Sequence, residues 1–414
     1  MSNDTHHRVI VIGAGAAGTM AAIFAASAHA ETTLVERSAD GGRKILVSGG
    51  GRCNVLPARV DETRFVTDSS PNLLRKLVRA WPLAAQRAFF EQTLGIPLAE
   101  ESESAKLFPV SNRARDVRDG LLDYARRQGV RMRFEARVMS VAPTAAGWEV
   151  MLDTGETLNA DAVVVATGGL SVPATGSDGD GLRVLASLGH EMHPTYAALT
   201  PITAAPSAYT ALAGVSLTVS LTARSEARSA QSHGGFLFTH RGYSGPSVLD
   251  VSHVLVRARA EQQPARLQVQ WTALGDAGWE AVLKPHGTRT VLGALRAELP
   301  DRLAAVLLDV AHVDAARVLS ELRRDERLRL IDTLVRGDLP WHGDEGYKKA
   351  EVTGGGVALG EVHPRTMESR RHRGLFLCGE VLDAFGPIGG YNFHWAWSTG
   401  RAAGLGAAGP ARVE

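Results

Sequence analysis

The sequence predicts an α/β fold in which a domain with a parallel sheet is interrupted by an inserted domain of antiparallel strands and helices. Three observations predict this. A β-branched run, Val9–Ile12, leads into a glycine-rich turn and an alanine-rich helical pattern. Short segments of alternating apolar residues replace this pattern between residues 198 and 273. A buried-strand pattern returns at Gly374–Glu380, so the C-terminal part is expected to complete the first domain.

The first strand, turn and helix carry glycines at the spacing of a Rossmann-like dinucleotide-binding turn. Such a turn brings main-chain N–H groups close to a pyrophosphate and lets the helix pack tightly on the strand. A second strand, residues 32–36, ends in an acid that the fold would present to ribose hydroxyls. The residues predicted to form this dinucleotide site are Gly13, Ala14, Gly15, Ala16, Ala17, Gly18, Glu36 and Arg37.

A glycine-dense segment with three cationic side chains follows, from Gly41 to Asn54. Its glycine content predicts a loop rather than a helix, lying close over a flat or anionic ligand. Arg43, Lys44 and Arg52 are candidates to bind a phosphate or a substrate anion. A flexible surface loop with solvated charges is the alternative interpretation.

Helices and a small meander are predicted next. Residues 72–95 and 113–129 have helical apolar spacing, and the second segment is rich in arginine. Such a basic face is usually only solvated, but RNA contact is an alternative. Short strands between residues 131 and 158 predict a β-meander. Asp161–Gly169 is typical of a central strand that ends in a Thr-Gly-Gly turn.

The alternating segments place the inserted domain at residues 191–345, between a first part at 1–190 and a C-terminal return at 346–414. Period-two patterns at 215–223, 235–240 and 266–272 predict an antiparallel sheet or barrel. The charged segment 289–336 is expected to be helical, and residues 395–406 to form the closing helix.

Composition limits the class of protein. The 414 residues exceed what one hydrophobic core usually organises, and the formal net charge of +1 argues against a surface built as a whole to bind nucleic acid. Two cysteines make no disulfide scaffold, so a cytoplasmic location is expected. No membrane anchor is expected, because glycines interrupt the apolar segment at Val9–Ala30. No metal site is expected, because the 14 histidines and two cysteines show no ligand spacing beyond the His6-His7 pair.

Five separated motifs carry a resemblance to a known family: residues 42–54, residues 108–112, residues 166–181, residues 238–246 and residues 379–392. Nearly end to end, the chain resembles the bacterial NAD(P)/FAD-dependent oxidoreductases, also called aminoacetone-oxidase-family FAD-binding enzymes, which include BaiN-like flavoproteins. The resemblance implies an FAD-binding domain interrupted by a β-barrel domain with a helical part. It implies FAD as the cofactor.

The resemblance also implies which further residues contact FAD, with Val138 near the adenine. These residues are Arg43, Lys44, Gly51, Arg52, Asn54, Val138, Ala166, Thr167, Gly168, Gly379, Glu380, Asp383, Gly390, Asn392 and Phe393. From position alone, Glu380 and Asp383 follow a buried strand and could reach a ribityl or phosphate group. A helix that starts near Tyr391 would direct its positive end toward the pyrimidine edge of a flavin.

The leading hypothesis for the reaction is reduction of a polarised C=C bond in a small molecule, by hydride transfer from flavin N5. No second glycine-rich dinucleotide motif follows Gly18, so NADH or NADPH would act as a transient reductant, or another reductant would serve. The alternatives are dihydrouridine formation in ribosomal RNA, amine oxidation, and a non-catalytic flavin-binding redox or scaffold module.

The proton donor for such a reduction has several candidates. Cys53 lies in the cationic loop, where neighbouring Arg or Lys side chains are expected to lower the pKa of its thiol. A small buried residue that packs under a ring is the alternative role for Cys53. His240, Tyr243 and His394 are competing donors, although a lone histidine more often has a structural role.

Overall fold

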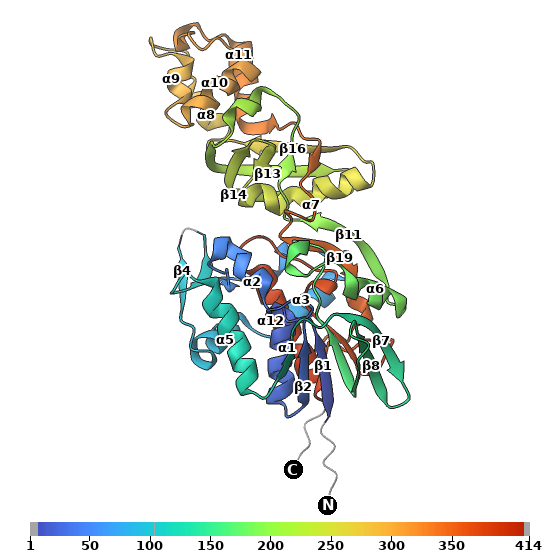
Figure 1. The fold of residues 1–414 in the computed structure, drawn as a ribbon. Helices are drawn as coiled ribbons and strands as arrows, with labels where there is room; N and C mark the ends of the chain where they lie inside the picture. Colours follow the sequence, from blue (N-terminus) through green and yellow to red (C-terminus); the bar gives the residue numbers. More distant parts are fainter. Residues whose placement is uncertain (1–6, 103, 410–414) are drawn as a thin grey trace, which may run out of the picture. The chain divides into compact units, whose positions relative to one another are not determined.

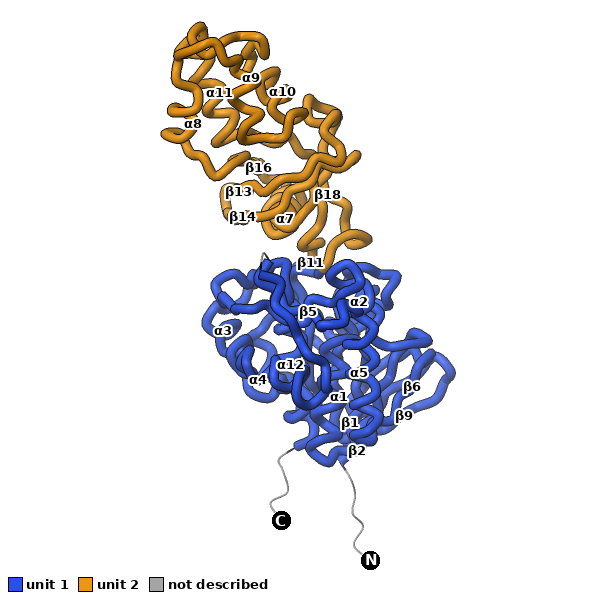
Figure 2. Tube along the Cα trace, turned by 90° about the vertical axis from the view of Figure 1, so that its left-hand side faces the viewer, with its two compact units in different colours: residues 1–195, 352–414 blue, residues 196–351 orange. Residues whose placement is uncertain are grey.

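A computed structural model describes residues 7–102 and 104–409 of the chain (Figure 1), so His6 lies outside the described residues. The chain divides into two compact units (Figure 2). Unit 1 comprises residues 1–195 and 352–414, and unit 2 comprises residues 196–351, where we predicted an insert at 191–345. Each unit has a hydrophobic core of its own.

A five-stranded parallel sheet forms the centre of unit 1, in the order β20-β10-β1-β2-β6. The central strands are buried along almost their whole length, as their continuous apolar runs predict. The strands are β1 (Arg8–Ile12), β2 (Glu31–Val35), β6 (Arg131–Arg133), β10 (Ala162–Val165) and β20 (Leu375–Leu377). The prediction that the C-terminal part returns to this sheet is confirmed.

Two helices from opposite ends of the chain pack closely together in unit 1. These are α1 (Ala16–Ser27) and α12 (Tyr391–Ala407). A Cβ atom at Gly400 would lie 2.3 Å from the carbonyl oxygen of Ala17, and one at Gly404 would lie 2.2 Å from that of Ala21. Glycine at these two positions therefore lets the two backbones come into contact.

Smaller elements complete unit 1. The predicted meander is confirmed as an antiparallel sheet of β7 (Val138–Thr144), β8 (Gly147–Leu152) and β9 (Thr157–Ala160). The other strands are β3 (Leu56–Pro57), β4 (Leu98–Glu101), β5 (Lys106–Pro109) and β19 (Val352–Val357), and β11 (Met192–Ala198) continues past residue 195 into unit 2. The other helices are α3 (Pro71–Arg79), α4 (Leu83–Ala88), α5 (Ala114–Arg127) and α6 (Asp180–Ser187).

The glycine-dense segment contains a short helix, α2 (Arg43–Val47), so the prediction of a loop throughout this segment is wrong. The five helical residues include no glycine. Gly42, with φ 71°, precedes the helix, and Gly49 and Gly50 follow it with φ 55° and 67°. The glycines therefore bound the helix, because their left-handed conformations end regular structure on either side.

A seven-stranded antiparallel sheet forms unit 2, in the order β17-β16-β13-β14-β15-β12-β18. The expected closed barrel is not formed by the described residues, since the two outermost strands pair on one side only. Each outermost strand is two residues long. The helix α7 (Pro246–Ala260) packs against the sheet and forms a hydrophobic core with it, whereas in a closed barrel the core would lie inside the sheet. The strands are β12 (Ile202–Thr203), β13 (Ser216–Ser225), β14 (Ser229–Thr239), β15 (Gly242–Ser244), β16 (Ala265–Gln270), β17 (Gly337–Asp338) and β18 (Gly343–Asp344).

The charged segment of unit 2 is helical as predicted. Its helices are α9 (Val291–Leu295), α10 (Asp301–Val310) and α11 (Arg324–Arg336), and α8 (Asp276–Val282) lies before the predicted segment. Across residues 7–102 and 104–409, no helix combines the length and the apolar character needed to span a membrane.

Replacing Gly404 by alanine is expected to lower the free energy of unfolding by about 1–3 kcal/mol, because the added methyl group would lie 2.2 Å from the backbone oxygen of Ala21. Urea denaturation followed by tryptophan fluorescence measures this. Gly120→Ala in α5 is the control, because its methyl group would meet only the mobile end of Ile96. Equal stability of the two variants would contradict the close helix contact.

Candidate functional site

The glycines of the turn after β1 differ in their surroundings: two of them lie against the backbone, and one borders open space. A Cβ atom at Gly13, which has φ +102°, would lie 2.6 Å from the carbonyl oxygen of Ala166, and one at Gly18 would lie 1.8 Å from that of Gly13. A Cβ atom at Gly15 would have no neighbour within 4 Å. Gly13 and Gly18 are therefore required by close backbone contacts, whereas Gly15 borders open space.

The open space at Gly15 adjoins the N-terminus of α1. Gly15 is the N-cap of this helix and no side chain caps it. The N–H groups of the first helical turn, at Ala16 and Ala17, have no acceptor within the helix, and the helix dipole adds positive potential there. A dinucleotide pyrophosphate fits such a place.

Glu36 lies beside the glycine turn, as predicted. Its Oε2 accepts a hydrogen bond from the Ala14 N–H at 2.8 Å, and its Oε1 accepts from the N–H and the hydroxyl of Ser38 at 2.8 and 2.6 Å. The Glu36 carbonyl accepts from the Ala136 N–H at 2.9 Å, so β7, which starts at Val138, begins next to the end of β2. The elements expected to hold an adenosine group thus lie together.

Arg37 and the Thr-Gly-Gly turn border the same region. The Arg37 guanidinium pairs with Asp178 and lies 3.4 Å from Asp180, so its charge is neutralised within the unit. Ala166 contacts the glycine turn. A Cβ atom at Gly181 would lie 2.0 Å from Thr167 Oγ1, and one at Gly168, with φ +76°, would lie 2.7 Å from the Ser177 hydroxyl. Thr167 therefore packs against the first turn of α6, and Gly168 packs against the segment that precedes it.

A network of polar side chains joins four segments that are distant in sequence. Lys44 Nζ donates to Glu380 Oε2 at 2.6 Å and to the hydroxyl of Ser171. Ser171 donates to Glu380 Oε1 at 2.6 Å, and the Thr353 N–H donates to the same oxygen at 2.9 Å. The ion pair is largely buried, since the Lys44 side chain is 27% exposed and the Glu380 side chain is 18% exposed. Lys44 and Glu380 were predicted separately, but Thr353 has no sequence signal that marks it.

The other two cations of the glycine-dense segment have partners of their own. Arg43 Nε donates to Asp40 at 2.6 Å, and this hydrogen bond holds the pKa of Asp40 below its usual value. Arg52 pairs with Glu101 at 3.0 Å and its guanidinium lies 4.0 Å from the centre of the Phe108 ring. Both charges are therefore compensated in the protein before any ligand binds.

Asp383 faces the protein interior. Its Oδ2 accepts from the Thr67 hydroxyl at 2.8 Å and from the Ser69 N–H at 3.0 Å. Burial raises the pKa of this carboxyl group. His193 completes the cluster, with Nε2 3.2 Å from the Ser69 hydroxyl. The Asp383 oxygen that was expected to reach a ribityl or phosphate group thus orders the 67–69 segment.

The C-terminal motif shapes the chain through close contacts. A Cβ atom at Gly379 would lie 2.7 Å from the Ala17 Cβ, and one at Gly390, with φ +91°, would lie 2.4 Å from the Leu56 carbonyl carbon. The side-chain amide of Asn392 accepts a hydrogen bond from the Gly386 N–H and donates one to the Gly386 carbonyl, each at 2.9 Å. Phe393 stacks on Trp397 at 5.2 Å. Side chains here fold the segment, and no side chain caps the N-terminus of α12.

Cys53 does not have the reactive environment that its cationic neighbours suggest. Its side chain is 0% exposed, and burial raises the pKa of the thiol to about 12, so the expected lowering of this pKa is wrong. Desolvation dominates because Arg43 and Arg52 are occupied by carboxylates. Next to it, Asn54 Oδ1 is buried without a hydrogen-bond partner in the described part of the chain, and Gly51 has φ +85°.

The other proton-donor candidates occupy three different environments. His394 is 2% exposed, and burial lowers the pKa of its imidazole to about 4, so it is neutral at pH 7. Tyr243 donates its hydroxyl to the Pro340 carbonyl at 3.0 Å, and burial raises its pKa. His240 is exposed and lines a pocket in unit 2. Among these donors, only His240 is accessible to solvent in the described structure.

Comparison with known proteins gives consistent relatives over nearly the whole chain. Residues 7–406 match the family model described as HI0933-like protein Rossmann domain. The ribosomal RNA dihydrouridine synthase of Escherichia coli K12 is 34% identical over 404 residues, which cover 94% of this chain and 95% of that protein. The 3-dehydro-bile acid delta(4,6)-reductase of Clostridium scindens is 31% identical over 412 residues, covering 97% and 99%.

Solved structures share the fold at low sequence identity. A 3-ketosteroid delta1-dehydrogenase from Sterolibacterium denitrificans, in complex with 1,4-androstadiene-3,17-dione, has a TM-score of 0.54 at 13% identity, covering 97% of this chain and 99% of that chain. At this identity the likeness concerns architecture alone. The family match and the two full-length relatives decide the classification: the chain belongs to the HI0933-like Rossmann-domain family of FAD-binding oxidoreductases.

Proposed function

We propose that this protein is an FAD-dependent reductase that saturates an activated C=C bond of a small molecule, with NADH or NADPH as a transient reductant. The observation that most supports this proposal is the open space at Gly15. The N-terminus of α1 borders this space, and so does Ala14, whose N–H donates a hydrogen bond to Glu36. FAD, when bound, supplies the hydride for such a reaction.

The residues of unit 1 have distinct tasks in this proposal. The N–H groups of Ala16 and Ala17 would bind the pyrophosphate, Glu36 would exchange its present donors for ribose hydroxyls, and β7 from Val138 would border the adenine. Lys44 and Glu380 would order the segments around the rest of the cofactor. The first-turn N–H groups of α12 would stabilise negative charge on the pyrimidine edge of a reduced flavin.

The names of two relatives support a double bond as the reacting group. One relative is a delta(4,6)-reductase of a 3-dehydro-bile acid, and the other forms dihydrouridine. Both substrates hold a C=C bond conjugated to a carbonyl group, which makes one carbon electrophilic toward hydride. The shared chemistry supports this bond type, whereas the two substrates differ greatly in size.

Ribosomal RNA is the alternative substrate, because the E. coli relative is 34% identical. The arginine-rich segments at residues 113–137, 317–336 and 370–373, which would have to contact RNA together, do not favour it. Many of their guanidinium groups pair with carboxylates, as in Arg133–Glu156 at 2.6 Å and Arg336–Asp276 at 2.7 Å. A paired arginine releases fewer counterions on binding phosphate, so this surface suits a small molecule better.

Anaerobic mixing with NADH or NADPH is expected to bleach the flavin absorbance of the holoprotein, because the proposed cycle begins with flavin reduction. The reduced protein is then mixed with a 4-ene-3-ketosteroid or with uridine-containing ribosomal RNA, and reoxidation is followed at the flavin band. Faster reoxidation by the enone supports the proposal, and faster reoxidation by RNA selects the alternative. If neither nicotinamide bleaches the flavin and the dithionite-reduced protein reacts with neither substrate, the proposal fails.

Gly15→Val is expected to reduce FAD content at least tenfold without unfolding the protein. The added side chain meets no protein atom within 4 Å of its Cβ, and Gly15 has φ −77°, which any residue adopts. It would instead fill the space that we assign to the pyrophosphate. Flavin absorbance per protein and far-ultraviolet circular dichroism give the two readings. Gly275→Val, at the equally open start of α8, is the matched control and should retain full FAD content.

Cys53→Ser is expected to keep turnover within about threefold, because the thiol is buried and its pKa is about 12. Burial raises the pKa of both thiols, so neither Cys53 nor Cys378 should react with a disulfide reagent at pH 8 in the native protein. Both should react in guanidinium chloride. A hundredfold loss of turnover with normal FAD content would instead establish Cys53 as the proton donor.

A further inference from the structure

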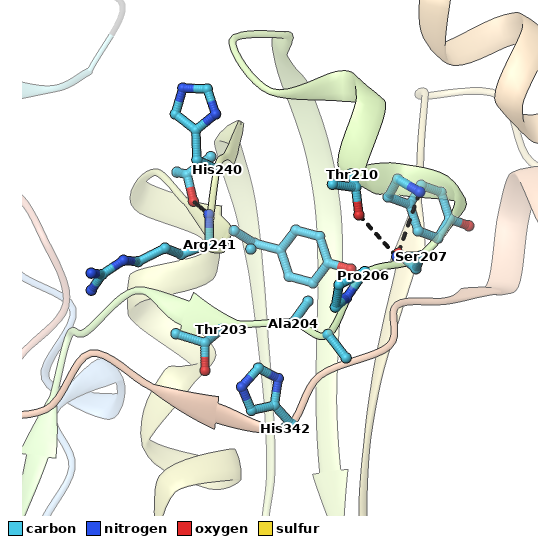
Figure 3. Close-up of a pocket in the computed structure, with 13 residues that line it drawn as sticks. Thr203, Ala204, Pro206, Ser207, Thr210, His240, Arg241 and His342 are labelled. Atoms are coloured by element: carbon cyan, nitrogen blue, oxygen red, sulfur yellow. Dashed lines mark hydrogen bonds between the residues drawn. The ribbon is translucent and has the colours of Figure 1, made fainter.

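Unit 2 contains a pocket of about 340 Å³ that the proposed reaction does not use (Figure 3). Three segments line it: residues 203–210, residues 239–243 and His342. Strand pairing brings them together, because Thr203 pairs with Gly242 on one side and with Gly343 on the other. The pocket therefore follows from the edge of the seven-stranded sheet and lies entirely within this unit.

The backbone at this edge is tightly fixed. The Ala204 N–H donates to the Arg241 carbonyl at 2.8 Å, and the His342 N–H donates to the Thr203 carbonyl at 2.9 Å. Gly242 has φ +147°, and a Cβ atom there would lie 2.3 Å from the Ile202 carbonyl oxygen. The backbone of the turn that carries His240 and Arg241 is therefore fixed, so the two side chains extend from fixed Cα positions.

The polar side chains of the pocket are donors without an acidic partner. His240, Arg241 and His342 are exposed, and no described residue accepts a hydrogen bond from their side chains. The lining includes no Asp or Glu. By contrast, arginines elsewhere in unit 2 pair with carboxylates, such as Arg327 with Glu280 at 3.2 Å and Arg329 with Asp325 at 2.9 Å.

Hydroxyl groups add further donors at the opposite end of the pocket. Thr210 Oγ1 accepts from the Ser207 N–H at 2.9 Å, and Ser207 Oγ accepts from the Tyr209 N–H at 3.3 Å (Figure 3). Each of these oxygen atoms serves as an acceptor toward the backbone, so its O–H proton is available to another group. Neutral imidazole also keeps one N–H donor, so the surplus of donors does not depend on histidine protonation.

An apolar surface lies between these two ends. Ala204, Pro206 and the ring of Tyr243 contribute to the lining. The Tyr243 hydroxyl is already bound to the Pro340 carbonyl, so this residue presents its ring rather than an acid. A volume of about 340 Å³ falls within the range of small-molecule sites and exceeds what a bare ion needs.

We propose that this pocket binds a small organic anion. A carboxylate or phosphate group would accept hydrogen bonds from Arg241 and His342, which directly precede the two strands that flank β12 on either side, because the guanidinium fork and imidazole N–H groups match such oxygens. The carbon skeleton would lie on Tyr243 and Pro206. Every residue that forms the site belongs to unit 2.

Calorimetric titration of the FAD-loaded, oxidised protein tests the proposal without any turnover. Two anionic probes, uridine 5′-monophosphate and benzoate, are compared with their neutral counterparts, uridine and benzamide. We expect at least one anion to bind at least tenfold more tightly than its neutral counterpart, and the better anion identifies phosphate or carboxylate as the preferred group. Equal affinity of anions and neutral counterparts, or no binding of either anion at millimolar concentration, would overturn the proposal.

Substitutions locate the binding. Arg241→Gln and His342→Gln should each weaken the better anion about tenfold or more, because each removes charge or a donor from an exposed position at little cost in stability. Arg266→Gln, an exposed arginine of β16 outside the pocket, is the matched control and should leave the affinity unchanged. If Arg241→Gln and Arg266→Gln weaken binding equally, the effect is general charge and the proposed site is wrong. Binding of long RNA without binding of the mononucleotide would also refute it.

Discussion

The close approach of backbone segments around the turn at Gly13–Gly18 is the constraint on which unit 1 depends. The Gly13 turn lies against Ala166, Gly18 lies against Gly13, and Gly400 brings α12 against α1. No side chain fits between these segments, so β1, β10 and the two helices have a single arrangement. That arrangement leaves Gly15 facing open space beside an uncapped helix N-terminus. The same packing that excludes side chains therefore creates the room for a dinucleotide.

The features that could be predicted from the sequence are those that residues close together in the chain determine. The strand, turn and helix at residues 9–30 follow from β-branched residues and glycine spacing, and Glu36 follows from the length of β2. The Lys44–Ser171–Thr353–Glu380 network could not be predicted, because Lys44 and Glu380 are 336 positions apart and their contact depends on the whole sheet order. Thr353 lies in a glycine-rich strand with no distinguishing pattern.

Three sequence predictions failed because each depended on tertiary structure. Cationic neighbours of Cys53 suggested a low pKa, but burial and the carboxylates that pair with Arg43 and Arg52 decide the opposite direction. The family resemblance implied a β-barrel, but two-residue edge strands leave the antiparallel sheet open. Glycine content suggested a loop, although the helix of Arg43–Val47 fits between the glycines.

The ion pair between Lys44 and Glu380 has a consequence for how the protein is made. Unit 1 is built from both ends of the chain, and its central sheet lacks β20 until residues 375–377 have been synthesised. Until then α1 has no α12 to cover it, and its apolar residues are exposed to the solvent of the growing chain. Unit 2 is continuous and can fold earlier on the ribosome. The cofactor site is therefore a late product of synthesis, and a chain shortened before α12 retains the glycine turn without the packing that shapes it.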